Sequence, residues 1–96
     1  MAFGGVRQNM NLGIEKFIED LNKINGKYVK IKITHKLYGN QKIEYDLCVL
    51  NDKGRLGFCF DEQEIYLNKW DILDYGIIQG VYFWADKIMR LEIQTT

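Results

Sequence analysis

The sequence predicts an α+β, mainly β domain: one N-terminal amphipathic helix followed by a strongly bent antiparallel sheet of five to six strands. Two observations support this prediction. Apolar residues recur at helical spacing between residues 11 and 24, and from residue 28 onward they alternate with polar residues in short runs. Segments rich in Gly and Asn separate these runs, and proline is absent, so the turns depend on Gly, Asn and Asp.

The composition is that of one folded domain with an uneven charge distribution. The chain of 96 residues is 47% hydrophobic and 14% aromatic, which is enough for a modest core. We expect residues 1–10 to form a flexible tail and residues 11–96 to form the domain. The 13 basic and 13 acidic residues cancel, which argues against a protein that coats nucleic acid or membranes. Residues 1–43 nevertheless carry a net charge of +5 (eight basic, three acidic), and residues 44–96 carry −5 (five basic, ten acidic).

The N-terminal segment and the cysteines favour a cytoplasmic location. No basic segment precedes a continuous apolar run at the N-terminus, as it does in a secretory signal. No stretch approaches the roughly 20 apolar residues that cross a bilayer. Cys48 and Cys59 are expected to be free thiols in a reducing compartment, and a disulfide between them under oxidation is the alternative.

The helix is predicted to begin at an Asn11 N-cap and to end at Asn25-Gly26, where glycine accepts a left-handed conformation. About 13 residues are too few for a stable isolated helix, so its apolar stripe must pack against the sheet. The stripe consists of Ile14, Phe17, Ile18, Leu21 and Ile24.

Three alternating runs, residues 29–37, 43–49 and 56–60, predict an antiparallel meander with turns at 38–41 and 51–54. Gly57 would permit a bend in the third strand. Centring the turns near Asn40 and Asp52 sets the register. The predicted cross-strand pairs are Lys36–Glu44, Thr34–Asp46, Tyr45–Phe60, Leu47–Phe58, Cys48–Gly57 and Cys59–Asp46.

The remaining third of the chain is predicted to add further short strands. Residues 64–67 form a short strand, and residues 69–75 form either a continuing strand or one helical turn. The β-prone residues 81–84 and a final strand over 88–94 form a hairpin around Asp86-Lys87.

This order of elements resembles the Sm-like and SH3-like small barrels. The segment NGKYVKIKI…YDLCVLNDKGRLGFCF has the shape of the first Sm motif, with a glycine before the first strand, alternating apolar positions and an acidic turn. The resemblance covers Leu12 to Tyr75 and implies a barrel with the helix across one open end, and RNA binding by its loops. Asn51 and Asp52 stand in a different order and spacing from the family's loop pair, and Asn68-Lys69-Trp70 replaces its second motif.

No pattern for catalysis or metal binding is present in the sequence. His35 is the single histidine, and we interpret it as structural because the predicted register places Tyr45, not a cysteine, beside it. There is no CxxC or HxxxH spacing, and the acidic residues 61–64 lack the glycine of a calcium loop. We therefore expect no enzymatic activity, metal, cofactor or small-molecule substrate.

The residues that remain point to binding. The leading hypothesis is a small non-enzymatic interaction module, a bacterial or phage accessory protein that binds another protein through an aromatic and acidic surface or forms a homo-oligomer through edge strands. The alternative is Sm-like binding of RNA or single-stranded nucleic acid by the basic face of the first strand. The alternatives without a binding function are that neighbouring elements cover the aromatic residues and that the lysines pair with acidic residues on the next strand. The predicted protein-binding residues are Trp70, Asp71, Asp74, Tyr75, Tyr82 and Trp84, and those of the nucleic-acid alternative are Tyr28, Lys30, Lys32, Lys36 and Tyr38.

Overall fold

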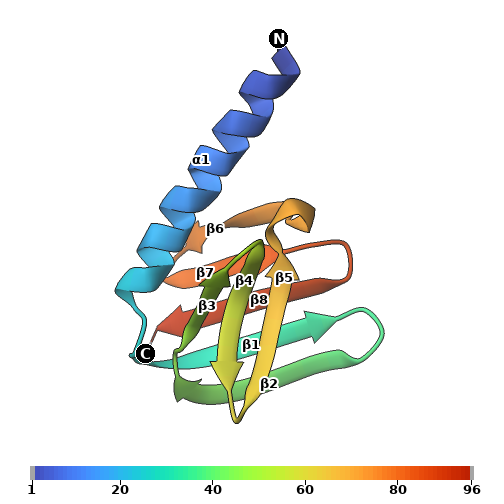
Figure 1. The fold of residues 1–96 in the computed structure, drawn as a ribbon. Helices are drawn as coiled ribbons and strands as arrows, with labels where there is room; N and C mark the ends of the chain where they lie inside the picture. The colour runs from blue at the N-terminus through green and yellow to red at the C-terminus, as the bar shows by residue number, and fades with distance from the viewer. Residues whose placement is uncertain (1, 96) are drawn as a thin grey trace.

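Two antiparallel sheets and one helix make up the fold (Figure 1). The computed structural model describes the backbone of residues 2–95 and the side chains of residues 13–95. The elements, in chain order, are α1 (Ala2–Lys23), β1 (Tyr28–His35), β2 (Gly39–Asp46), β3 (Val49–Asp52), β4 (Arg55–Phe60), β5 (Gln63–Asn68), the 3-10 turn η1 (Lys69–Asp71), β6 (Asp74–Ile78), β7 (Val81–Ala85) and β8 (Met89–Thr95).

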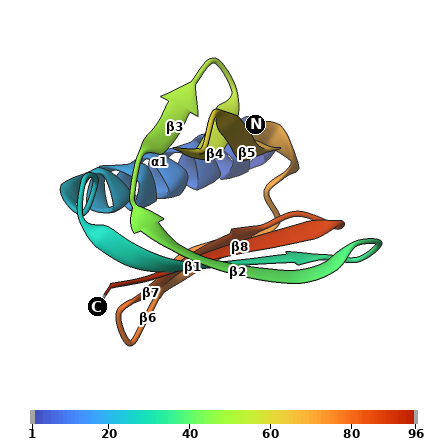
Figure 2. The ribbon, with the colours of Figure 1, turned by 90° about the horizontal axis from the view of Figure 1, so that it is seen from below.

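The strands divide between a five-stranded sheet in the order β2-β1-β8-β7-β6 and a three-stranded sheet in the order β3-β4-β5. Helix α1 and the three-stranded sheet lie on the same side of the five-stranded sheet, and the opposite face of that sheet is uncovered (Figure 2). The mainly β class with one helix is therefore confirmed, whereas the predicted single sheet of five to six strands was wrong, since residues 2–95 form eight strands in two sheets. The predicted barrel is not formed within residues 2–95, because the two sheets are not joined by hydrogen bonds into a closed ring.

The core lies between these layers. Alternation along each strand turns one set of apolar side chains inward, and the stripe of α1 meets them. Inward residues of the five-stranded sheet include Val29, Ile31 and Leu91, and those of the smaller sheet include Leu56 and Phe58. These five side chains are at most 3% exposed.

Helix α1 begins at Ala2 rather than at Asn11, so Asn11 is not its N-cap. Most of the segment predicted as a flexible tail has a helical backbone, and it contains no proline that would interrupt the hydrogen-bond ladder upstream of residue 11. The end near Asn25-Gly26 is confirmed, and Gly26 has a φ of +88°. The predicted stripe is confirmed too: Phe17, Ile18, Leu21 and Ile24 are at most 6% exposed, and Ile14 is half-buried at its edge.

The predicted pairing of the first two strands was wrong. Lys30, not Lys36, lies opposite Glu44, and Asn40, not Asp46, lies opposite Thr34. Residues 36–38 make the turn because the Nδ1 atom of His35 accepts hydrogen bonds from the backbone amides of Leu37 and Tyr38, at 3.0 and 3.4 Å. The strand therefore ends earlier than its alternating pattern suggests. The shift is an even number of residues, so every side chain keeps its predicted face.

The second predicted register was also wrong, because the chain changes sheets at Leu47-Cys48. β2 ends at Asp46, and β3 begins at Val49, which takes the place opposite Phe58 that was predicted for Leu47. Leu47 is instead 2% exposed in the core. Three further predicted pairs fail for the same reason: Tyr45–Phe60, Cys48–Gly57 and Cys59–Asp46.

Gly57 serves a different purpose from the predicted bend. It lies opposite Tyr66, and a Cβ atom at this position would overlap the backbone of Ile65 and Tyr66. Glycine therefore allows β4 and β5 to approach closely. Farther along the chain, the short strand β5, the helical turn η1 and the final hairpin of β7 and β8 agree with the prediction.

Candidate interaction surface

Of the predicted protein-binding aromatics, Trp84 belongs to the core, and Tyr75 and Tyr82 are partly buried against it. Trp84 is 0% exposed, and its Nε1 donates a hydrogen bond to the carbonyl oxygen of Leu56 at 3.0 Å. Tyr75 is half-buried with its ring centroid 5.6 Å from that of Phe17, and Tyr82 packs against the core from the same sheet face. Trp84 therefore cannot be a surface anchor in the folded protein, and the two tyrosines offer only part of their surface.

Trp70, Asp71 and Asp74 are exposed as predicted, and Trp70 is 75% exposed. The position of Trp70 is fixed by its turn. Asn68 Oδ1 accepts a hydrogen bond from the Trp70 amide at 3.1 Å, and the Lys69 amide donates to the Gly54 carbonyl at 2.7 Å. The backbone therefore holds a tryptophan outward at the end of β5.

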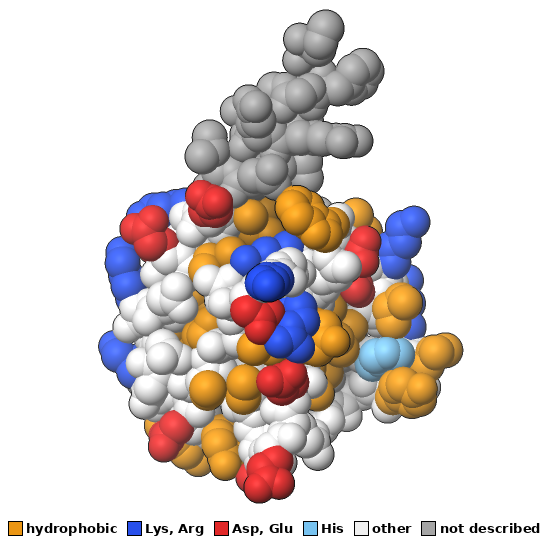
Figure 3. Space-filling view, in the orientation of Figure 1, with side chains coloured by type: hydrophobic (Ala, Val, Ile, Leu, Met, Phe, Trp, Pro, Cys, Tyr) orange, Lys and Arg blue, Asp and Glu red, His pale blue; other side chains and the backbone are white. Residues whose placement is uncertain are grey.

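Trp70 is followed three residues later by exposed Leu73 at the start of β6, and other exposed hydrophobic residues lie in the two hairpin turns at the same end of the five-stranded sheet as Leu73. The four most exposed large hydrophobic side chains of the described residues are Tyr38 (84%), Leu37 (79%), Trp70 (75%) and Leu73 (64%). Ile88, 52% exposed, lies in the β7–β8 turn. Hydrophobic side chains gather at the right of Figure 3, beside the pale-blue histidine. We call Leu37, Tyr38, Trp70, Leu73 and Ile88 the apolar rim.

Hydrogen bonds join the three segments that carry the apolar rim. The Lys36 amide donates to the Ile88 carbonyl at 3.0 Å, which links the β1–β2 turn to the β7–β8 turn. The Leu73 amide donates to the Ala85 carbonyl at 2.8 Å, which links the start of β6 to the end of β7. Asp86 Oδ1 accepts from the amides of residues 88 and 89 at 2.8 and 2.7 Å. The rim is therefore built on turns with satisfied backbone groups.

The charges beside the apolar rim differ from one end to the other. Exposed Lys36 and Lys87 accompany the two hairpin turns, whereas exposed Asp71 and Asp74 accompany Trp70 and Leu73. Sequence reasoning found the acidic end but missed Leu37, Leu73 and Ile88, and it assigned Tyr38 to nucleic-acid binding. The available signal was the presence of large apolar residues inside turn segments, where polar residues are usual.

The predicted nucleic-acid residues do not form one surface. Tyr28, Lys30 and Lys32 lie on the uncovered face of the five-stranded sheet, whereas Lys36 and Tyr38 lie in the β1–β2 turn. Lys42 of β2 joins the first group, directly opposite Lys32.

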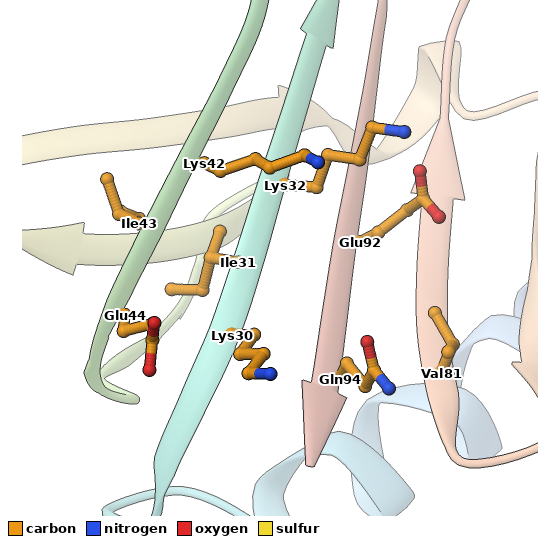
Figure 4. A pocket seen from close by; sticks show the side chains of 9 residues that line it. All are labelled: Lys30, Ile31, Lys32, Lys42, Ile43, Glu44, Val81, Glu92 and Gln94. Carbon is orange, nitrogen blue, oxygen red and sulfur yellow. The ribbon is translucent and has the colours of Figure 1, made fainter. Parts of the chain in front are cut away.

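A hollow of about 630 Å³ lies on this uncovered face (Figure 4). Lys30, Lys32 and Lys42 line it, together with the carboxylates of Glu44 and Glu92. Among the described side chains, none of the three lysines forms an ion pair. We call this the lysine hollow; its three ammonium groups exceed its two carboxylates by one charge.

His35 is the acceptor in the β1–β2 turn, and it lies opposite Gly39 and not beside Tyr45 as predicted. Its ring also lies against that of Tyr38, with centroids 4.5 Å apart, which supports one side of the apolar rim. Within residues 13–95, no three His, Cys, Asp or Glu side chains are grouped as metal ligands would be.

Comparisons with protein-family models, with curated proteins and with solved structures find no match for this chain. Among the described residues, no helix combines the length and the apolar character needed to cross a membrane. The chemistry of the apolar rim and of the lysine hollow is therefore the basis for the functional proposals.

Proposed function

We propose that the protein is a non-enzymatic interaction module that binds another protein through the apolar rim. The observation that carries this proposal is that strand pairing places four exposed hydrophobic side chains, Leu37, Tyr38, Leu73 and Ile88, at one end of the five-stranded sheet, with exposed Trp70 three residues before Leu73. Single exposed hydrophobic residues are normal on a protein surface, but a contiguous group marks a contact site. Trp and Tyr are also the residues most enriched among those that dominate binding energy.

The hydrogen bonds beneath the rim support binding by a preformed surface. A surface whose backbone is already ordered loses less conformational entropy on association than a flexible loop does. The charges define the partner further. The partner should therefore offer an apolar groove with acidic groups at one end, opposite Lys36 and Lys87, and basic groups at the other, opposite Asp71 and Asp74. The partner we propose is a different protein with such a groove, and a second copy of the chain is an outcome that the test distinguishes.

The test first locates the contact by photo-crosslinking. A photoreactive amino acid replaces Tyr38 or Trp70 in the apolar rim, and Ile78 in the control, because Ile78 is 59% exposed at the opposite end of β6. We expect one partner to crosslink from both rim positions and not from the control. A crosslink to the chain itself, matched by a dimer in sedimentation, would replace the proposed partner with self-association.

Affinity for the purified partner then provides the decisive measurement. Trp70→Ala and Leu37→Ser should each weaken binding at least tenfold, since a residue that dominates an interface costs about 2 kcal/mol or more. Ile78→Ser should leave the affinity unchanged while conserving the fold by circular dichroism. If Trp70→Ala and Leu37→Ser bind the partner as tightly as the unchanged protein and Ile78→Ser do, the apolar rim is not the contact site.

The lysine hollow favours a second candidate function, the binding of single-stranded nucleic acid. Its specific observation is that Lys32 and Lys42 lie directly opposite each other without an ion pair, although like charges in such positions repel. A phosphate group between them would relieve that repulsion. Binding of a single-stranded RNA should weaken as salt rises, and each neutralised phosphate contributes a slope of about −0.7 in log K against log salt.

Lys32→Gln and Lys42→Gln should each reduce that slope, whereas Lys53→Gln, in the exposed β3–β4 turn on the other sheet, should not. RNA affinity that is undetectable at low salt, or that falls equally in all three variants, would remove this candidate function.

A further inference from the structure

The two cysteines of the chain lie directly across from each other at the junction of the two sheets. The β3–β4 register pairs Val49 with Phe58 and, continued by one residue, pairs Cys48 with Cys59. The Cys59 amide donates a hydrogen bond to the Cys48 carbonyl at 2.9 Å, so the backbones remain paired at this position. Opposite residues of an antiparallel pair have Cα atoms about 4.5–5.5 Å apart, which lies within the range that a disulfide spans.

The two thiols differ in their surroundings. Cys48 is exposed, whereas Cys59 is half-buried in β4. Burial, followed by the neighbouring Cys48 thiol, raises the pKa of the Cys59 thiol above its usual value. Thiolate character and access govern oxidation, so the exposed cysteine is the one that meets an oxidant first.

We propose that Cys48 and Cys59 form a modification site that takes a hydroperoxide and closes to an intramolecular disulfide. The Cys48 thiolate attacks one oxygen of the hydroperoxide, the O–O bond breaks, and Cys48 becomes a sulfenic acid while an alcohol or water leaves. The sulfur of Cys59 then attacks the sulfenic sulfur, the S–O bond breaks, and the hydroxyl leaves with the Cys59 thiol proton as water while the S–S bond forms. Two thiols lose two electrons, and the hydroperoxide gains them.

The position of the site gives the disulfide a structural consequence. Cys48 lies between β2 and β3, where the chain passes from the five-stranded to the three-stranded sheet. The new bond would link this connection to Cys59 in β4 and so join the two ends of the β3–β4 hairpin covalently. Closing a loop of about 12 residues restricts the unfolded chain and should raise the Tm by roughly 10–20 °C. A dithiol reductant reverses the bond. This site is independent of the apolar rim.

The experiment treats the reduced protein with one equivalent of hydrogen peroxide at low protein concentration and then alkylates the remaining thiols. We expect both cysteines to escape alkylation in a monomer that has lost two hydrogen atoms by mass. Its Tm should rise and return to the starting value with dithiothreitol. Alkylation of both thiols, disulfide-linked dimers as the main product, or an unchanged or lowered Tm would overturn the proposal.

Two serine variants test the order of the steps. Cys59→Ser should retain a sulfenic acid at Cys48 that reacts with dimedone, because no second thiol can displace its oxygen. Cys48→Ser should react with peroxide at least several-fold more slowly, because the remaining thiol is half-buried. A faster reaction of Cys48→Ser than of Cys59→Ser would contradict the assignment of Cys48 as the first site.

Discussion

Replacing the two tryptophans separates the core of this protein from its surface. Trp84 is the largest fully buried side chain of residues 13–95, and it contacts Phe17 with ring centroids 5.8 Å apart. Trp84→Ala should therefore destabilise the fold by about 3–5 kcal/mol, the usual cost of removing a buried aromatic residue. That loss is a large part of the roughly 5–15 kcal/mol that stabilises a domain. Trp70→Ala should change stability by no more than about 0.5 kcal/mol, because its side chain is 75% exposed.

Urea unfolding followed by far-UV circular dichroism measures both changes without depending on the tryptophans. With a slope of about 1–2 kcal/mol per molar urea, Trp84→Ala should lower the midpoint by roughly 2 M or more, and Trp70→Ala by less than about 0.5 M. Equal shifts, or a larger shift for Trp70→Ala, would refute the assignment of Trp84 to the core and Trp70 to the surface.

Trp84→Phe refines the same prediction. It keeps an aromatic ring in the core but removes the donor to the Leu56 carbonyl, a bond that joins the five-stranded sheet to β4. A buried acceptor that loses its partner costs about 1–3 kcal/mol, and the smaller ring adds a cavity cost. Trp70→Phe is the matched control. If the two phenylalanine variants unfold at the same urea concentration, the hydrogen bond between the sheets contributes no measurable stability.

Three further predictions concern local structure. Gly57→Ala should destabilise the fold by about 1–3 kcal/mol or more in urea unfolding, because its Cβ atom would overlap the Ile65 backbone, and full stability would contradict that close approach. His35→Ala should lower the free energy of unfolding by about 0.5–1.5 kcal/mol and speed hydrogen exchange at the Leu37 and Tyr38 amides, which donate to the His35 ring. Unchanged exchange would mean that the turn is stable without this ring. The hydrogen bond from Arg55 holds the pKa of Asp52 below its ordinary value of 3.8. The stabilisation from that pair is present above this value and is lost as the pH falls through the lower folded pKa; Asp52→Asn should flatten the fall in Tm over that acidic range.

Periodicity predicts which way each side chain faces, but not where a strand ends. The stripe of α1 and the alternation of β1 follow from spacing alone, so their buried faces were foreseen. The length of β1 depends instead on the His35 ring, which accepts two amides of the next turn, and on Gly39, whose φ is +81°. Histidine is not a usual turn residue, so the alternating pattern extended the strand past its true end.

The location of Trp84 was not predictable because β7 is apolar on both faces. Trp84 faces the core, while Phe83 on the other face is 6% exposed, with the Arg90 guanidinium 4.3 Å from its ring centroid. A cation therefore covers the outward aromatic residue, and both neighbours are buried. From the sequence, such a run looks the same as a strand with one exposed aromatic face, which is why Trp84 was assigned to a contact surface.

The apolar rim shows what tertiary structure adds to the functional hypothesis. Leu37, Leu73 and Ile88 lie in three separate turns or strand boundaries, where an exposed hydrophobic residue has no particular meaning by itself. The strand order β2-β1-β8-β7-β6 brings these boundaries to one end of the same sheet, and amide hydrogen bonds at 3.0 and 2.8 Å hold them there. The gathering therefore depends on non-local pairing of β1 with β8, not on any local pattern. A variant that breaks that pairing should lose the contact surface even if every rim residue is retained.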